Sequence, residues 1–166
     1  MLEGDTYVQG STMAAHNTIL RQYGALPFAI TDEGEVKVLL VTTRRRRGWI
    51  IPKGWPIRNL TAAGTAEREA YEEAGVVGTI IGEEPVGSYH YEKAGTLHRE
   101  TIYEVSVFLF AVERQLRKWP ERSERETRWF APGEASRQVV PIGLANILLT
   151  TAWQPLVGSI QTKTFA

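Results

Sequence analysis

Cysteine is missing from this chain of 166 residues, which excludes disulfide bonds and thiolate chemistry. The lack of disulfides is compatible with a reducing compartment. Long apolar segments are also missing, because no run approaches the roughly 20 residues that a membrane-spanning helix needs. The N-terminus has no basic region followed by an apolar block, as a secretory signal would have. We therefore expect a cytoplasmic protein that does not insert into a membrane.

The chain also lacks an excess of positive or negative charge. Lysine and arginine together number 19, and aspartate and glutamate also number 19, so the formal net charge is zero. No overall field draws the protein toward nucleic acid or anionic membranes, and a nucleic-acid partner is not expected. Recognition of an anion must therefore depend on local groups.

The length and composition predict one folded domain. Hydrophobic residues make up 43% of the chain and charged residues 23%, as in ordinary globular proteins. Residues 1–18 show neither helical nor strand periodicity and are predicted to form a flexible tail. We expect the domain to span residues 19–153 and residues 154–166 to form a loosely held C-terminal tail. The sequence does not decide between a monomer and a homodimer.

Apolar runs predict strands at residues 21–30, 36–41, 48–51, 76–81, 86–91 and 101–112. Pro27 should restrict the first of these strands to a sheet edge or a bulge. Turns are expected at residues 31–34 and 52–54, and the charged stretch 116–128 is expected to be a loop.

A last helix is predicted at residues 142–152, with Pro141 in its first turn. Apolar residues recur in it at spacings of three and four, so we expect it to pack by one face. That face would consist of Ile142, Ala145, Leu148, Leu149 and Ala152.

Three glutamates crowd another predicted helix at offsets of 0, 3 and 4. Because successive helical residues are rotated by about 100°, Glu69, Glu72 and Glu73 share one face. Repulsion between carboxylates is relieved most directly by a cation, and hard divalent ions such as Mg²⁺ prefer oxygen ligands. A metal site is therefore the first hypothesis for this face.

The same helix has a buried side and recognisable ends. Its start is predicted between residues 59 and 64, with Thr61 as a plausible N-cap. Gly75 can adopt the left-handed conformation that ends a helix. Small residues on the face opposite the acids would let the helix lie close to a sheet, namely Ala63, Ala70 and Ala74.

Plainer interpretations of these residues stay open. Acids on a helix often form only a solvated face, and the arginine run from Arg44 to Arg47 could simply keep a sheet edge soluble. Trp49 and Trp129 are better explained as core aromatics than as base-stacking platforms. Glu124 and Glu126 could add a late ligand or base, but a charged loop explains them as well.

The segment from Gly54 to Val76 resembles the Nudix box, whose pattern is GX5EX7REUXEEXGU with U a bulky apolar residue. The resemblance implies an α/β fold, the Nudix-type α/β/α sandwich with a mixed β-sheet and a loop-helix-loop catalytic motif. It also implies hydrolysis of a phosphoanhydride bond that depends on a divalent metal, with Mg²⁺ expected and Mn²⁺ as the alternative. The matching positions are Gly54, Arg68, Glu69, Glu72, Glu73, Gly75 and Val76.

Two positions depart from the family pattern. Leu60 stands where the first glutamate of the box belongs, which removes one outer contact near the metal. Ala70 is smaller than the usual apolar residue. The three acids on the helix are intact.

Wider similarity is to the diphosphoinositol polyphosphate phosphohydrolase branch, which also includes diadenosine polyphosphate hydrolases. It runs through the segments 49–54, 98–99, 128–130 and 134–135. The branch implies a small-molecule polyphosphate substrate: a diphosphoinositol polyphosphate, a dinucleoside polyphosphate or a related nucleoside diphosphate derivative.

Roles can be proposed for the matched residues. Glu69 and Glu73 lie one turn apart on the same ridge and are predicted to chelate the metal, while Glu72 lies to one side as the base that takes a proton from water. Arg68 can reach Glu72 at a spacing of four residues, and by family resemblance it orients a catalytic carboxylate.

Basic residues near the box are candidates for binding substrate phosphates. Alternate arginines of an extended segment point to opposite sides, so about two of the four consecutive arginines can face the substrate. The candidates are Arg44, Arg45, Arg46, Arg47, Lys53, Arg58, His98 and Arg99.

Two further functions compete with this hypothesis. Leu60 in place of glutamate is compatible with a non-catalytic Nudix-fold module that binds a phosphorylated ligand without turnover. Removal of pyrophosphate from RNA 5′ ends is another hydrolase activity, but the neutral overall charge does not favour it.

Overall fold

The computed structural model describes residues 18–45, 47–93 and 101–159. Its strands are β1 (Thr18–Ile30), β2 (Val36–Thr42), β3 (Trp49–Ile50), β4 (Lys53–Gly54), β5 (Val76–Ile81), β6 (Gly87–Lys93), β7 (Thr101–Gln115) and β8 (Thr127–Phe130). Its helices are α1 (Ala62–Ala74), α2 (Pro132–Gln138), α3 (Ile142–Thr150) and α4 (Trp153–Ser159). Among the described residues, no helix is both long and apolar enough to span a membrane.

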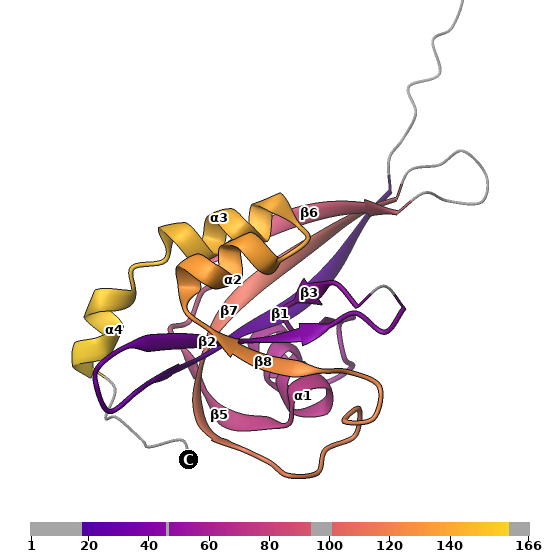
Figure 1. The fold of residues 1–166 in the computed structure, drawn as a ribbon. Coiled ribbons are helices and arrows are strands. Elements are labelled where there is room, and N and C mark those ends of the chain that lie inside the picture. Colours follow the sequence, from indigo (N-terminus) through magenta and orange to yellow (C-terminus); the bar gives the residue numbers. More distant parts are fainter. Residues whose placement is uncertain (1–17, 46, 94–100, 160–166) are drawn as a thin grey trace, which may run out of the picture.

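The strands form one mixed sheet with β1 and β7 at its centre (Figure 1). These two strands run parallel, from Thr18 opposite Thr101 to Phe28 opposite Ala111. The main path is β3-β2-β1-β7-β5, and β4, β6 and β8 pair with β1, β7 and β2 respectively. All pairings except that of β1 with β7 are antiparallel.

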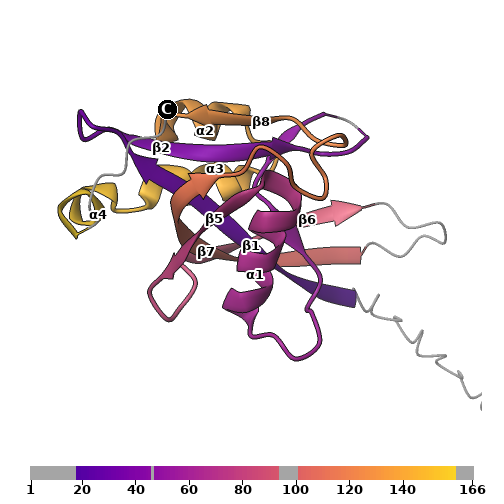
Figure 2. The same cartoon turned by 90° about the horizontal axis from the view of Figure 1, so that it is seen from below.

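Helices cover both faces of the sheet, as Figures 1 and 2 show from two directions. The alternation of side chains along a strand divides the core in two. Leu26 and Leu40 pack with α2 and α3, whereas Ala25 and Leu39 pack with α1. The mixed α/β architecture with helices on both sides confirms the fold class predicted from the Nudix resemblance.

Most strands follow the sequence prediction, but two details were wrong. β1 is an interior strand and not an edge. Pro27 fits there because β4 pairs only with Tyr23 and Gly24, and β2 only from Phe28 onward, so Pro27 falls in the gap between the two ladders. The turn expected at residues 52–54 contains strand β4, since Lys53 pairs with Gly24.

The packing face of α3 also differs from the prediction. Leu144, Ile147 and Leu148 are buried, whereas Ile142 and Leu149 are 80% and 64% exposed. The spacing of three and four residues is also met by this second set, and only the position of β6 and α2 beside α3 selects it. Pro141 is the N-cap of α3 and not part of its first turn.

The chain ends of the domain are partly described. Residues 154–159 belong to α4 and are not a loose tail: Trp153 meets the ring of Phe28 edge-on, and Leu156 packs against the core. Thr18 already belongs to β1, and the rest of the predicted N-terminal tail, residues 1–17, lies outside the described residues.

Candidate active site

Helix α1 carries the three glutamates and begins and ends where the sequence predicted. The side chain of Thr61 accepts a hydrogen bond from the backbone N–H of Gly64 at 3.0 Å. Gly75 has a φ of 65° and donates its N–H to the carbonyls of Ala70 and Tyr71. The small buried residues Ala66, Ala70 and Ala74 let α1 lie close to the sheet, whereas Ala63, predicted on this face, is only partly buried.

The absence of a side chain at Gly54 gives the carboxylate of Glu69 the space beside strand β4. A Cβ atom at position 54 would lie 2.0 Å from Oε1 of Glu69, which is impossible without a shift. Glu69 has no hydrogen-bond or ion-pair partner among the described residues. Burial, and then the charges of Glu72 and Glu121, raise the pKa of the Glu69 carboxyl. Glu69 is thus a crowded carboxylate whose oxygens are available to bind a ligand.

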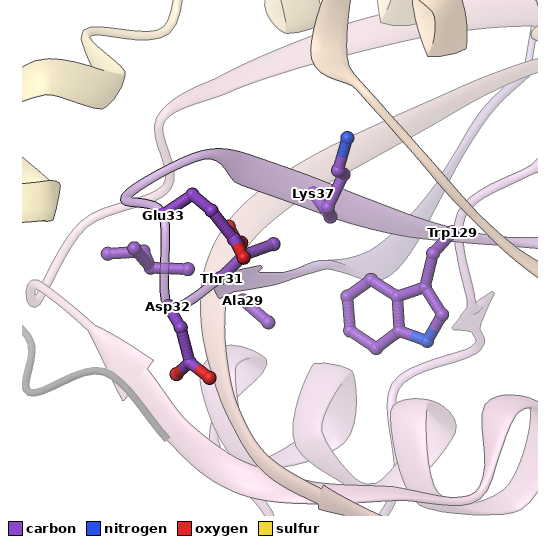
Figure 3. Close-up of a pocket in the computed structure, with 7 residues that line it drawn as sticks. Ala29, Thr31, Asp32, Glu33, Lys37 and Trp129 are labelled. Atoms are coloured by element: carbon purple, nitrogen blue, oxygen red, sulfur yellow. The ribbon is translucent and has the colours of Figure 1, made fainter. Parts of the chain in front are cut away.

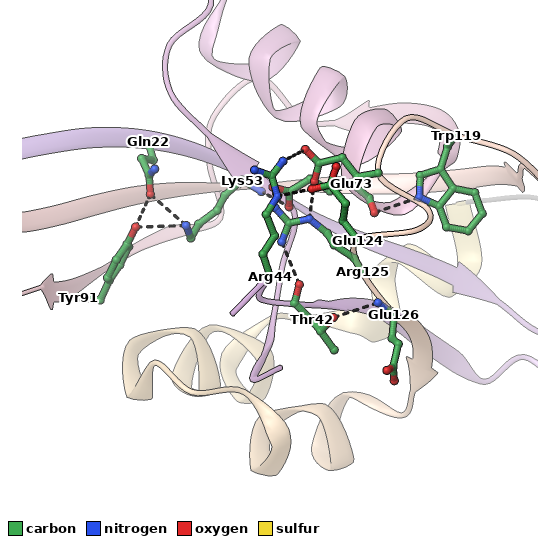
Figure 4. A network of polar contacts seen from close by, with 11 residues as sticks. Gln22, Thr42, Arg44, Lys53, Glu73, Tyr91, Trp119, Glu124, Arg125 and Glu126 are labelled. Carbon is green, nitrogen blue, oxygen red and sulfur yellow. Dashed lines mark hydrogen bonds and ion pairs between the residues drawn. The ribbon is translucent and has the colours of Figure 1, made fainter. Parts of the chain in front are cut away.

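Glu73 is the most buried of the three acids, with a side chain only 7% exposed. Arg125 Nη2 donates to Glu73 Oε1 at 2.6 Å, and the backbone N–H of Lys53 donates to Oε2 at 3.3 Å (Figure 4). Burial raises the pKa of Glu73 to about 8, and Glu69 and Glu121 add to the rise, while Arg125 opposes it. The raised pKa shows that Arg125 offsets this crowding of negative charge only in part, and a further cation would relieve the rest.

Arg68 and Glu72 form an ion pair on the exposed side of the helix. Arg68 Nε lies 2.5 Å from Glu72 Oε1, and the Glu72 side chain is 32% exposed. This is the contact expected from the spacing of four residues. It leaves Glu72 accessible and oriented, which suits a residue that exchanges a proton with water.

The segment 115–126 packs against the C-terminal end of α1 and hydrogen-bonds to it, although the sequence indicated only a charged loop there. Helix ends leave carbonyl groups without intrahelical partners. Four consecutive carbonyls, those of residues 72–75, accept hydrogen bonds from the backbone N–H of Glu121, the Trp119 indole, the Gln115 amide and the backbone N–H of Leu116. A tryptophan within a charged stretch was the one available sign that this segment packs.

Glu69, Glu72 and Glu73 form an acid cluster on α1. Two residues of the segment 115–126, Glu121 and Arg125, act on this cluster and were missed by sequence reasoning. Arg125 Nε lies 2.5 Å from Glu121 Oε2, and Arg125 Nη1 donates to the carbonyl of Thr42 at 2.9 Å. From the sequence, only their neighbours Glu124 and Glu126 were candidates in this segment. These two instead pair with Arg44 and Arg47, so they lie on the exposed side.

The arginine run is therefore partly neutralised by the chain itself. Arg44 forms ion pairs with Glu121 and Glu124, the latter at 2.8 Å, and Arg47 pairs with Glu126 at 3.2 Å. Arg45 is exposed, as is Arg58, and neither has an ion pair within the described part of the chain. Arg46, His98 and Arg99 lie outside the described residues.

Lys53 connects the acid cluster to a group of aromatic rings. Its Nζ bonds Gln22 Oε1 and the Tyr91 hydroxyl, each at 3.2 Å, and lies 4.9 Å from the centre of the Tyr91 ring. Tyr91 stacks on Tyr103 at 4.8 Å between ring centres, and Trp55 packs on Tyr103 at 5.7 Å. Trp55 is 49% exposed, so one end of this row of rings faces solvent.

The residues present suit a hard divalent cation that is held partly by other ligands. Glu69 and Glu73 offer carboxylate oxygens, but within the described residues no three acidic or histidine side chains converge as a complete ligand set. Mg²⁺ typically binds through one or two carboxylates, keeping several waters and adding substrate phosphates. That mode fits this donor set. Leu60, at the position of the missing family glutamate, is 47% exposed and offers no ligand.

A hollow of about 340 Å³ lies elsewhere, at the turn between β1 and β2 (Figure 3). Its lining residues are Ala29, Ile30, Thr31, Asp32, Glu33, Lys37 and Trp129. It shares no residue with the acid cluster, so the candidate active site is the surface of α1 and β4 instead.

Comparison with known proteins identifies the family of this chain. A model of the NUDIX domain family matches residues 20–149. The chain belongs to the Nudix family, which confirms the family resemblance of the sequence. Membership of the diphosphoinositol polyphosphate branch stays a prediction.

The curated relatives are Nudix hydrolases of Arabidopsis thaliana. Nudix hydrolase 12, mitochondrial, is 38% identical over 104 residues, which cover 61% of this chain and 51% of the relative. Nudix hydrolase 13, mitochondrial, is 32% identical over 112 residues, covering 64% and 55% respectively. The chain thus spans about half the length of the curated relatives it matches.

Solved structures share the fold. The binary complex of a C. elegans Ap4A hydrolase superposes with a TM-score of 0.60 at 14% identity, covering 85% of this chain and 99% of that one. The E. coli dihydroneopterin triphosphate pyrophosphohydrolase superposes with a TM-score of 0.61 at 18% identity, covering 81% and 95%. At these identities the likeness is one of fold alone.

Proposed function

We propose that the protein hydrolyses a phosphoanhydride bond in a dinucleoside polyphosphate or a related nucleoside diphosphate derivative, with Mg²⁺ or Mn²⁺ as cofactor. The observation that carries the proposal is the crowding of Glu69 and Glu73 beside Gly54 within an intact set of helical Nudix-box acids. Burial and neighbouring carboxylates raise the pKa of both side chains, and a bound cation would offset this crowding of negative charge.

Four residues of the box have roles in this reaction. Glu69 and Glu73 would hold the divalent ion, which when bound stabilises negative charge on the phosphate oxygens. Glu72 accepts the proton of the attacking water. Arg68, 2.5 Å from Glu72, fixes the orientation of that carboxylate.

The aromatic row supports a nucleoside in the substrate over an inositol. The backbone N–H of Lys53 bonds Glu73, and the next residue, Gly54, lies against Glu69. The residue after that, Trp55, is exposed to solvent. A base stacked on Trp55 would therefore lie close to a phosphate held at the acids. Lys53 belongs to this arrangement, and the exposed Arg45 and Arg58 are further proposed phosphate-binding residues.

A diphosphoinositol polyphosphate is the less favoured substrate. The family branch implies it and the arginine run offers candidates to bind its phosphates, but Arg44 and Arg47 already pair with acids of the chain. The substrate panel should nevertheless include it, together with a dinucleoside tetraphosphate, a dihydroneopterin triphosphate and triphosphorylated RNA. A cytoplasmic location likewise stays a proposal, because several relatives carry "mitochondrial" or "chloroplastic" in their names.

The decisive experiment compares wild type, Glu73→Gln and the control Glu67→Gln on this panel with Mg²⁺. Glu67 lies on the same helix but is exposed. We expect Glu73→Gln to lose activity by about a hundredfold or more, because it replaces a metal-binding oxygen, while Glu67→Gln stays close to wild type. If wild type turns over no compound, but calorimetry shows binding and the ligand is recovered intact afterwards, the protein is a binding module and the proposed hydrolysis is wrong.

A further inference from the structure

Arg125 is a buried cation held by three separate parts of the chain. Its side chain is only 8% exposed. Through Nη2 it bonds Glu73 on α1, through Nε it bonds Glu121 on the segment 115–126, and through Nη1 it bonds the carbonyl of Thr42 at the end of β2 (Figure 4). All three guanidinium nitrogens are thus used in charge-assisted contacts.

The two carboxylates that it joins have little access to water. Glu73 and Glu121 have side chains that are 7% and 17% exposed. Removing one partner of a buried ion pair leaves a charge with neither water nor counter-ion, which is far more costly than the net value of the pair. Arg44 also touches Glu121, but from a position that is 55% exposed. Within the described residues, Arg125 is the only side chain that forms an ion pair with Glu73.

We propose that Arg125 is a positioning residue whose guanidinium acts as a resident counter-cation for Glu73 and Glu121. It lets the acid cluster fold in its final arrangement before any divalent ion binds. The inference rests on the proposed metal site, because it treats the divalent ion as the other cation able to compensate these carboxylates. It assigns Arg125 no contact with the reacting atoms.

A counter-cation and a packing residue differ in one measurable way. If Arg125 only filled space, its loss would destabilise the protein equally with and without metal. If it compensates charge, a divalent ion should replace part of what is lost. The stabilisation by Mg²⁺ should therefore be larger in a variant without Arg125 than in wild type.

The test is the thermal midpoint, Tm, of the full chain in alkaline buffer with EDTA or with saturating Mg²⁺. The variants are Arg125→Met, Arg125→Lys, the double variant Arg125→Met with Glu73→Gln, and the control Arg117→Met. Arg117 is an exposed residue of the same segment with no ion pair in the described structure.

We expect Arg125→Met to lower Tm in EDTA by about 10 °C, and Mg²⁺ to raise its Tm several degrees more than that of wild type or Arg117→Met. Arg125→Lys should be intermediate. The double variant should regain part of the Tm in EDTA and lose most of the extra response to Mg²⁺, because one of the two carboxylates that Arg125 compensates has become neutral. A variant that folds only with Mg²⁺ also supports the proposal.

The proposal is overturned if Mg²⁺ raises the Tm of Arg125→Met no more than that of wild type. If Arg125→Met fails to fold in either condition, Arg125→Lys decides: a response to Mg²⁺ no larger than that of wild type overturns the proposal. The measurement needs no turnover. An inactive wild type whose variants show the expected Mg²⁺ response would refute the proposed hydrolysis alone, and an active wild type without that response would refute only the role of Arg125.

Discussion

Glu73 is the residue at which opposing local forces are strongest. Burial and two neighbouring carboxylates favour the protonated form, whereas Arg125 favours the charged form, and the balance leaves a pKa of about 8. The pKa of an ordinary glutamate is 4.5. A metal ion can bind only the deprotonated carboxylate, so a proton and a metal compete for this side chain.

The pH dependence of metal affinity follows from that competition. Below a pH of about 8 the proton must be displaced before the ion binds, so the affinity for Mn²⁺ should fall by up to about tenfold for each pH unit toward 6. Calorimetric titration of the wild type with Mn²⁺ at several pH values would measure this slope. Glu73→Gln should bind more weakly and without that slope. A wild-type affinity that is constant across this range would contradict the prediction.

At the scale of elements, the end of α1 is stabilised by a segment distant in sequence. Gly75 ends the helix in the left-handed conformation, and the Trp119 ring lies directly over it. A Cβ atom at position 75 would lie 2.4 Å from that ring. One glycine therefore serves both the backbone conformation and the docking of the segment 115–126.

Gly75→Ala should consequently destabilise the fold by about 2–4 kcal/mol, which combines the cost of a left-handed non-glycine residue with that of overpacking. Chemical denaturation followed by circular dichroism would measure it. The matched control is Gly133→Ala, because a Cβ there meets no atom within 4 Å; we expect it to be neutral or stabilising by up to about 1 kcal/mol. Equal effects of the two substitutions would refute the role given to Trp119.

At the scale of the whole molecule, one sheet supports two apolar cores. Leu39 and Leu40 are neighbours on β2 and both fully buried, but Leu39 packs on the α1 side and Leu40 on the side of α2 and α3. Since the same strands form the wall of both cores, neither core can unfold while the other keeps its sheet. Unfolding should be cooperative.

Leu39→Ala and Leu40→Ala should each lower the free energy of unfolding by about 2–5 kcal/mol and shift one common transition. Leu149→Ala on the exposed face of α3 should change it by less than about 1 kcal/mol. Calorimetry and tryptophan fluorescence would be compared in each variant. Two transitions, each moved by only one of the buried leucines, would show that the cores unfold separately.

Local signals in the sequence were sufficient to predict α1, its caps and most strands. A helix cap such as Thr61 and a left-handed glycine such as Gly75 act within a few residues, and an apolar run such as residues 76–81 is read without knowing its partners. The Nudix box could be recognised because all of its residues lie in one short segment. The roles of Glu69, Glu72 and Glu73 as ligands and base stay predictions that the experiments above test.

Only the tertiary structure decided which distant residues complete the acid cluster. Arg125 lies 52 positions from Glu73, and no local pattern relates the two. It also decided that Arg44 and Arg47 pair with acids, that Pro27 falls in a ladder gap, and which face of α3 is buried. These outcomes depend on how strands pair and how loops pack. The energies of these contacts come from segments that are distant in the sequence and meet only in the folded protein.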